Sequence, residues 1–344
     1  MASAVKNDSV CDHVQVSSSH LHWAVAGGLA AWAAARLSGA DRVHAAEGWA
    51  VPALSFTPQV TAAALAALPL LRGGSSRGAA TLAAAALAAS VAPRAIPRPQ
   101  PPADGAELRV LTSNMLFGRA DAETIVRLAA VSGADVLFLQ ELTAGAAARL
   151  QRAGLGSVLP YQVFESVTSG PKGSGIWARY PLRGGLDVQP LSRSMPVARI
   201  DLPGGESAQL VCVHLRPPRP SHSPSGAARW RAEMGLLPGP GDVPVILAGD
   251  FNATVDHARF RALLRQGYVD AAVQAGRGLV PTWGPRPGGK LAMLAIDHIL
   301  LDPRCAVRSV SAHSVPGTDH RALYAQIQLP AVSRPCDRPP GDAA

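Results

Sequence analysis

Hydrophobic residues are arranged differently in two parts of the chain. Before residue 100 they form three long and nearly uncharged segments, over residues 21–37, 49–71 and 78–92. After residue 106 they form short runs that are rich in β-branched side chains and end in polar residues. Short runs of this kind predict buried β-strands, and helical patterns lie between them. The later part of the chain therefore predicts an α/β domain. Its expected helices are Asp121–Ala130, Ala144–Ala153, Gly226–Leu236 and Ala258–Gln266.

The polar residues at the ends of the predicted strands indicate which chemistry the protein could perform. The apolar run Val243–Ala248 leads through Gly249 into Asp250, Phe251 and Asn252. Because side chains alternate along an extended chain, Asp250 and Asn252 are expected to share a face. A carboxylate and a carboxamide placed in this way can take a proton and orient a water molecule. The same residue types are also common in turns, so this run alone leaves both interpretations open.

The same pattern recurs along the chain. Other predicted strands end in, contain or follow polar residues, which are Asn114, Gln140-Glu141, His214, Asp297 and Asp319-His320. Strand ends gather at one edge of an open α/β sheet, so we expect these side chains to lie close together. Carboxylates, amides and imidazoles are the residue types that metal-dependent phosphoryl chemistry uses.

In this order, the motifs resemble those of the endonuclease/exonuclease/phosphatase superfamily. That family includes DNase I-like nucleases, apurinic endonucleases, neutral sphingomyelinases and inositol polyphosphate phosphatases. The resemblance covers residues 107–330 and implies a four-layer α/β sandwich, in which two mixed β-sheets are flanked by helices. The chain departs from the family pattern at Thr318, where Ser commonly precedes the Asp-His pair, and at Arg321-Ala322, where an aromatic residue and Pro are more usual.

Within this resemblance, three residues are expected to hold a divalent metal, Mg²⁺ or Mn²⁺. Glu141 is the expected principal ligand, because a carboxylate is a hard oxygen donor. Asp319 would support the metal directly or through water. Asn114 would position Glu141 or the substrate phosphate.

The remaining motif residues are expected to act on the substrate. Asp250 would activate the attacking water as a general base, and Asn252 would orient that water. Asp297 would hold His320 in one tautomer and favour its cationic form, so that His320 stabilises charge or protonates the leaving oxygen. His214 would contact a phosphate oxygen, with a partner that the sequence does not identify. His298 and His313 are expected to be structural, and Trp283 is equally compatible with substrate contact and packing.

The three N-terminal apolar segments predict two or three transmembrane helices, since a span needs about 20 apolar residues. Segment 49–71 has no charged residue, whereas 78–92 is short and rich in Ala, which leaves its crossing open. A soluble helix of the length of 49–71 would show a polar face. A signal peptide is the other alternative, but apolar segments follow the first one. Residues 1–20 form a predicted tail, 93–106 an exposed Pro-rich linker and 331–344 a disordered tail.

The charge of the chain gives only weak information about its partners and its orientation in a membrane. The net charge of +8 and the pI of about 9.9 suit anionic partners such as phosphates, nucleic acid or a lipid surface. No dense Lys/Arg run predicts nucleic-acid binding. Arg72 and Arg77 favour a cytoplasmic loop, while Arg42, Arg94 and Arg98 nearly balance them.

A resemblance to bacterial membrane members of the superfamily, some of them associated with glycopeptide-antibiotic resistance, decides the orientation. It favours a multi-pass protein of the cell membrane with an extracytoplasmic catalytic domain. Cys305 and Cys336 could pair there, although four cysteines alone prove nothing.

The expected function is that of a membrane-anchored, divalent-metal-dependent phosphoesterase. Its substrate would be a phosphodiester or pyrophosphate, and a phosphorylated lipid is favoured because the spans hold the enzyme at the bilayer. One alternative is an extracytoplasmic nuclease with DNA or RNA as substrate. A second is a non-catalytic membrane scaffold on the same fold, against which the complete set of polar residues argues. No protein partner can be inferred.

Overall fold

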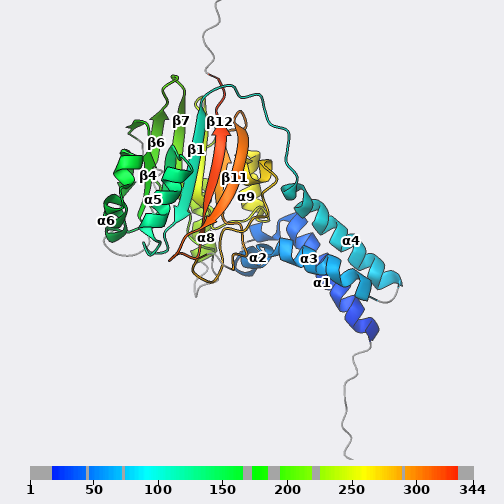
Figure 1. The fold of residues 1–344 in the computed structure, drawn as a ribbon. Coiled ribbons are helices and arrows are strands. Elements are labelled where there is room, and N and C mark those ends of the chain that lie inside the picture. The colour runs from blue at the N-terminus through cyan, green and yellow to red at the C-terminus, as the bar shows by residue number, and fades with distance from the viewer. Residues whose placement is uncertain are drawn as a thin grey trace, which may run out of the picture.

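Two parts are visible in the computed structural model, a layered α/β domain and a group of helices that projects from it (Figure 1). The structure describes residues 18–43, 46–71, 74–165, 173–184, 194–218, 225–288 and 291–331. The predicted tails therefore lie almost wholly outside the described residues, as does Cys336. Cys305 is a buried free thiol.

The α/β domain is built on two mixed sheets of six strands each. The first has the order β11-β12-β1-β2-β4-β3 and the second β5-β6-β7-β8-β10-β9. The strands are β1 (Glu107–Asn114), β2 (Val136–Leu142), β3 (Tyr161–Glu165), β4 (Gly173–Ala178), β5 (Leu182–Arg183), β6 (Val197–Asp201), β7 (Ser207–His214), β8 (Val245–Asp250), β9 (Val269–Asp270), β10 (Asp297–Leu301), β11 (Ala306–Ser314) and β12 (Arg321–Gln328).

The predicted four-layer sandwich is confirmed. Side chains alternate along β1, so that Val110 packs between the sheets and Leu111 packs under the outer helices. The first sheet is covered by α5 (Ala122–Val131), α6 (Ala144–Arg152) and α7 (Leu155–Val158), and the second by α8 (Ser225–Gly235) and α9 (Ala258–Arg265). The short helix α10 (Ala271–Gln274) follows β9. The four predicted helices thus match α5, α6, α8 and α9 closely. Strands covered on both faces are apolar almost throughout, as the short runs indicated.

Strand pairing brings the polar strand ends together. In the first sheet β1 runs parallel to β2, with Asn114 opposite Gln140. In the second sheet β7 runs parallel to β8, with His214 opposite Asp250. The antiparallel strand β10 places Asp297 opposite Asp250 on the other side. The carboxyl ends of both parallel pairs therefore meet at one end of the sandwich.

The N-terminal part contains α1 (Ser18–Ser38), α2 (Glu47–Leu54), α3 (Thr57–Ala67) and α4 (Gly74–Val91), with short 3-10 turns at Ala40–Arg42, Leu68–Leu70 and Ala92–Ala95. Both α1 and α3 pack against α4 (Figure 1). The span predicted over 49–71 is not confirmed as one straight helix, because the chain breaks between α2 and α3 with a bend of 61°. Pro52 lies inside α2 and Pro58 in the first turn of α3, and each lacks the N–H that a continuous helix would use.

The predicted two or three transmembrane helices are not confirmed. Among the described helices, the segment Gly74–Ala95 alone is long and apolar enough to cross a bilayer unaided. The segments Glu47–Leu54 and Thr57–Leu70 reach that standard only when they are taken together as a bent pair. Helix α1 has 21 residues but is not among the candidates.

Buried charges fix the N-terminal helices to the α/β domain. Asp256, which lies between β8 and α9, accepts hydrogen bonds from Arg36 at 2.6 Å and from Arg94 at 2.7 Å. All three side chains are buried. Asp41 accepts a hydrogen bond from the backbone N–H of Ala258, the first residue of α9. Buried charges are tolerated only when they are paired, so these contacts hold the ends of α1 and α4 at the domain.

The predicted linker follows the surface of the domain. Within 93–106, Pro93 and Ala95 to Pro99 are exposed, whereas Arg94 and Ala103 are buried. The linker is hydrogen-bonded to the domain at two points, where Arg98 donates its backbone N–H to the carbonyl of Gln274 and Gly105 donates to that of Leu329.

Candidate active site

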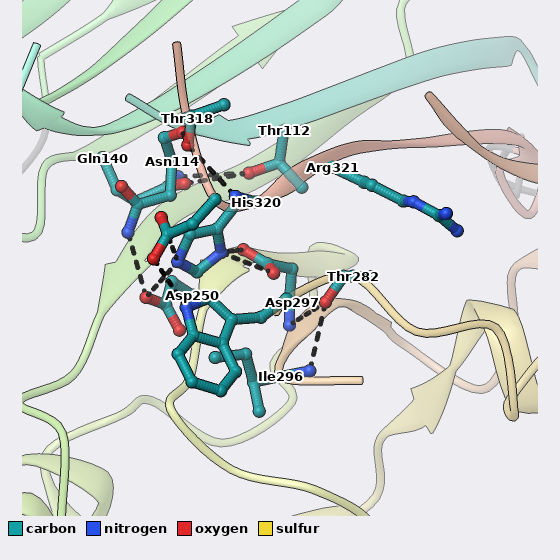
Figure 2. Close-up of polar contacts among 12 residues, drawn as sticks. Thr112, Asn114, Gln140, Asp250, Thr282, Ile296, Asp297, Thr318, His320 and Arg321 are labelled. Atoms are coloured by element: carbon teal, nitrogen blue, oxygen red, sulfur yellow. Dashed lines mark hydrogen bonds and ion pairs between the residues drawn. The ribbon is translucent and has the colours of Figure 1, made fainter. Parts of the chain in front are cut away.

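A buried histidine, His320, lies among the polar strand ends (Figure 2). Its Nδ1 is 2.9 Å from Asp297 Oδ2, and Asp297 begins β10. Its Nε2 is 3.9 Å from both Asp250 Oδ2 and Asp319 Oδ1. Burial acts to lower the pKa of His320, but Asp297 and the other two carboxylates outweigh it and raise the pKa to about 9. His320 is therefore a cation at neutral pH.

Asp250, the last residue of β8, is the second central group. Burial raises its pKa to about 7, against the attraction of His320. The carboxylate accepts hydrogen bonds from Asn114 Nδ2 at 3.0 Å and from the backbone N–H of Asn252 at 2.8 Å. A carboxylate whose pKa lies near neutral pH is suited to take and return a proton.

Gly249 permits this placement of Asp250. Its φ is +147°, and a Cβ atom there would lie 2.0 Å from the carbonyl oxygen of Val213 in β7. Only glycine therefore lets β7 and β8 approach so closely just before the catalytic end of the strand.

Glu141 extends the site onto the first sheet. Its Oε2 accepts the backbone N–H of Phe117 at 2.8 Å, and its Oε1 accepts Asn114 Nδ2 at 3.4 Å. The Asn114 amide thus contacts Glu141 of one sheet and Asp250 of the other. His214 is buried, and its Nε2 lies 3.7 Å from Glu141 Oε1, which identifies a partner that the sequence left open.

Glu141 and Asp319 line the same cleft and carry the hard oxygen donors that a divalent cation takes. Asp319 Oδ1 is buried and has no hydrogen-bond partner among the described residues, while Oδ2 accepts Trp283 Nε1 at 2.9 Å. A buried carboxylate oxygen without a partner calls for an explanation, and an ion is one. Glu141 and Asn114 add the hard oxygen donors that Mg²⁺ and Mn²⁺ prefer.

A second group, Asp250, Asp297 and His320, could also hold a metal by proximity, since its ligand atoms lie within 4.8 Å of one another. In this structure the three side chains form an ion-paired unit, in which His320 Nδ1 is hydrogen-bonded to Asp297 and Nε2 lies 3.9 Å from Asp250.

Two threonines hold the backbone of candidate site residues in place, and the sequence did not identify this role. Thr318 donates to the carbonyl of Asn114 at 2.9 Å and accepts the backbone N–H of His320 at 3.1 Å. A serine hydroxyl could make the same two hydrogen bonds, which explains why Thr318 can replace the Ser that is common at this position. Thr282 accepts the backbone N–H of Asp297 at 3.1 Å (Figure 2).

Trp283 and Gln140 support the site in different ways. Trp283 holds Asp319 through its indole N–H, so its role, left open by the sequence, includes positioning a proposed metal ligand. Gln140 donates to Thr112 Oγ1 at 3.1 Å and to Cys212 Sγ at 3.3 Å, which links the two sheets beneath the site.

The site opens into a cleft of about 430 Å³. Leu116, Phe117, Glu141 and Asn252 all line it, and they are the only described residues other than glycine with a positive φ. Such a backbone conformation costs about 1–3 kcal/mol for each residue, and residues of this kind concentrate at functional sites. Asn252 therefore reaches the side of Asp250 through a left-handed turn, where we expected simple strand alternation.

The structure brings the predicted site residues into one cluster, although their individual roles stay predictions. They are Asn114, Glu141, His214, Asp250, Asn252, Asp297, Asp319 and His320. His298 stands apart from the cleft and pairs with Asp270 at 2.6 Å, and His313 contacts Ser311 on β11. Both contacts agree with the structural role expected of these two histidines.

Known proteins share this fold. The model of the endonuclease/exonuclease/phosphatase family matches residues 111–320. An endonuclease/exonuclease/phosphatase from Beutenbergia cavernae is 19% identical, with 65% of this chain and 72% of that chain covered and a TM-score of 0.51. Humanized D. rerio TDP2 is also 19% identical, with coverage of 64% and 99% and a TM-score of 0.51.

A further structure, D. rerio TDP2 complexed with a single-strand DNA product, is 18% identical, with coverage of 65% and 99% and a TM-score of 0.51. No curated protein matches the sequence. At these identities the solved structures show a common fold, and helices α1 to α4 precede the part that the family model matches.

Proposed function

Because the chain belongs to the endonuclease/exonuclease/phosphatase family, we propose that it is a membrane-anchored, divalent-metal-dependent phosphoesterase. Its substrate is a phosphodiester or pyrophosphate, and a lipid-linked one is favoured. The observation that carries the proposal is the pairing of a base, Asp250, with a cationic acid, His320, across a gap of 3.9 Å. That gap is too long for a direct hydrogen bond, but one oxygen atom lying beside it could hydrogen-bond to both groups.

The residues divide the chemistry between them. A phosphoester resists attack because it is negatively charged, so catalysis consists mainly of charge neutralisation and placement of the nucleophile. Glu141, Asn114 and Asp319 would hold a divalent cation, which would supply positive charge against the phosphate oxygens when bound. Asp250 takes the proton of the attacking water, and Asn252 orients that water. His320, held by Asp297, stabilises the developing charge or protonates the leaving oxygen.

Exposed apolar side chains on the N-terminal helices support attachment to a membrane. Leu70 is 76% exposed and Leu82 is 75% exposed, and Leu21, Trp23 and Leu65 are also exposed. Apolar surface of this kind is typical of membrane or protein contact sites. The end of α3 and the start of α4 lie away from the domain (Figure 1). We place that end in the cytoplasm and the catalytic domain outside, because Arg77 lies in the first turn of α4 and the resemblance to membrane members of the superfamily favours this orientation.

A nuclease is the second candidate. It is favoured by the similarity to TDP2, of which one structure carries a single-strand DNA product, and by the net charge of +8. A non-catalytic scaffold remains the third alternative, and the complete set of polar residues argues against it.

The direct test is hydrolysis by the purified full-length protein in detergent with Mg²⁺, with Mn²⁺ and with a chelator. The substrates are an alkyl diphosphate, a sphingomyelin-like diester and plasmid DNA. Activity is expected to require the cation, and Glu141→Gln is expected to lower kcat/KM by about 100-fold or more, as is typical when a transition-state interaction is removed. Glu123→Gln, an exposed position on α5, is the matched control. Hydrolysis that resists the chelator in both variants would contradict the proposal, and cleavage of DNA alone would favour the nuclease.

A further inference from the structure

We propose that the corner between α2 and α3 is an apolar wall of the catalytic cleft that selects substrates whose phosphate carries a hydrocarbon chain. The inference rests on the proposed hydrolytic function and deepens it. The corner lies before residues 111–320, which the family model matches, so it is a property of this chain beyond the family domain.

The cleft combines two kinds of surface. Asp250 and His320 contribute to its polar floor, whereas Pro52 and Phe56 from the corner contribute apolar side chains. Phe56 is half-buried, and Phe117 beside the cleft is 50% exposed. A molecule that fills this space must present a charged group at the floor and an apolar group at the wall. An amphiphilic phosphoester has this chemistry.

The corner is held firmly in place. His257 Nδ1 accepts the backbone N–H of Thr254 at 3.0 Å, so the ring proton of the neutral histidine lies on Nε2. Nε2 donates to the carbonyl of Val51 at 2.8 Å and lies 3.1 Å from Ser55 Oγ. Burial lowers the pKa of His257, which keeps the ring neutral. The wall is therefore already formed before substrate binds, which reduces the entropy cost of binding.

Further apolar side chains are exposed outside the cleft. Gln59 in the first turn of α3 donates to the carbonyl of Met293, which joins α3 to the loop before β10. Leu291 and Met293 of that loop are exposed, as are Leu65 and Leu70 farther along the chain from Phe56.

The charges of the cleft favour a hydrocarbon chain over a polynucleotide. Among its described lining residues there is no Lys or Arg, whereas Glu141, Asp250 and Asp319 are acidic. Binding of a nucleic acid depends largely on cationic contacts to successive phosphates. A single phosphate group with an apolar substituent needs no such row of cations.

The test compares substrates that share the scissile bond and differ only in chain length. Ethyl and dodecyl diphosphate form one pair, and ethyl and dodecyl para-nitrophenyl phosphodiesters form the other. The full-length protein is assayed with Mg²⁺ in dilute detergent. We expect Phe56→Ser to lower kcat/KM for the dodecyl substrate by about tenfold, equivalent to about 1.4 kcal/mol. The ethyl substrate should change by less than about twofold, and Phe56→Leu should retain the preference for the long chain.

Trp49→Ser is the matched control, because Trp49 is in α2, is 62% exposed and does not line the cleft. It is expected to leave both substrates unchanged. Equal effects of Phe56→Ser on both chain lengths, or no effect on either, would refute the proposal that the corner selects long chains. If Trp49→Ser caused the same selective loss, attachment of the protein to the detergent surface would explain the loss. That result would also refute the proposed apolar wall. A parent protein that hydrolyses neither pair would instead refute the proposed function itself.

Discussion

The link between Asp297 and His320 gives the sharpest test of the catalytic arrangement. Asp297→Asn removes a negative charge 2.9 Å from the Nδ1 of His320 and keeps the shape of the side chain. In the intact site, burial alone would lower the pKa of His320, and Asp297 makes the largest contribution that raises it to about 9. Without that charge the pKa of His320 is expected to fall, and the cation is lost at a lower pH.

The same substitution acts on Asp250. Burial is the main cause of the pKa of about 7, and the charge of Asp297 adds to it. Removing that charge therefore lowers the pKa of Asp250 as well. The active form needs Asp250 ionised and His320 protonated, so kcat/KM of the parent should be largest between about 7 and about 9. In Asp297→Asn both limbs of this profile should move to lower pH.

The magnitude follows from the role of His320. General acid catalysis contributes about 10²–10⁴-fold, so His320→Ala should lose a factor in this range. At a pH above the pKa of His320, each unit by which that pKa falls lowers the protonated fraction of His320 by up to about tenfold. Because the two residues act as one unit, the double variant should lose little more than His320→Ala alone.

The assay is kcat/KM from about pH 5 to about pH 10 at a fixed saturating Mg²⁺ concentration, on the substrate that the hydrolysis screen identifies. Asp270→Asn is the control, because Asp270 forms a comparable buried pair with His298 at 2.6 Å that does not line the cleft. It should lower thermal stability and leave both limbs in place. Fully multiplicative losses in the double variant, or an unmoved alkaline limb in Asp297→Asn, would refute the reasoning.

The remaining predictions concern the N-terminal helices. Asp256→Asn leaves Arg36 and Arg94 buried without their shared carboxylate and should lower the free energy of unfolding by about 3–5 kcal/mol, measured by thermal or denaturant unfolding. The exposed Asp104→Asn is its control, and equal stability of the two variants would show that the arginines find other partners. For orientation, a reporter that is active only outside the cytoplasm, fused after Pro102, should be active, since we place the catalytic domain outside. A silent reporter beside an active cytoplasmic reporter at the same point would reverse the topology.

Strand geometry let the sequence predict part of the candidate cluster, while the remaining members were identified by their resemblance to the family motifs. Asn114 and Gln140 lie opposite each other on parallel strands, and so do His214 and Asp250. Polar residues at the carboxyl ends of such strands must meet at one edge of the sheet. The supporting contacts of Thr282 and Trp283 could not be predicted in the same way, because they come from a loop whose path has no periodic pattern.

The α2–α3 corner was missed for a different reason. Segment 49–71 has no charged residue, and composition alone makes it similar to one membrane span. Pro52 and Pro58 were the available sign of a break, but a proline can also kink a helix without ending it. Tertiary contacts also hold the break in place, because Ser55 and Val51 contact His257, which is about 200 residues away in the chain. Arg36 and Arg94 likewise look like ordinary surface charges until Asp256 buries them.

Asp256 and His257 are consecutive, and this places two functions on one short segment. Asp256 binds the arginines at the ends of α1 and α4, while His257 holds the α2–α3 corner at the cleft. The segment begins only a few residues after Asp250, the proposed base, and it leads directly into α9. The position of the helices and the position of the base are therefore fixed by the same stretch of backbone. If the helices lie in a membrane, this stretch sets the height of the catalytic floor above the bilayer. A substrate anchored in that bilayer by its chain would then meet the base and the apolar wall together.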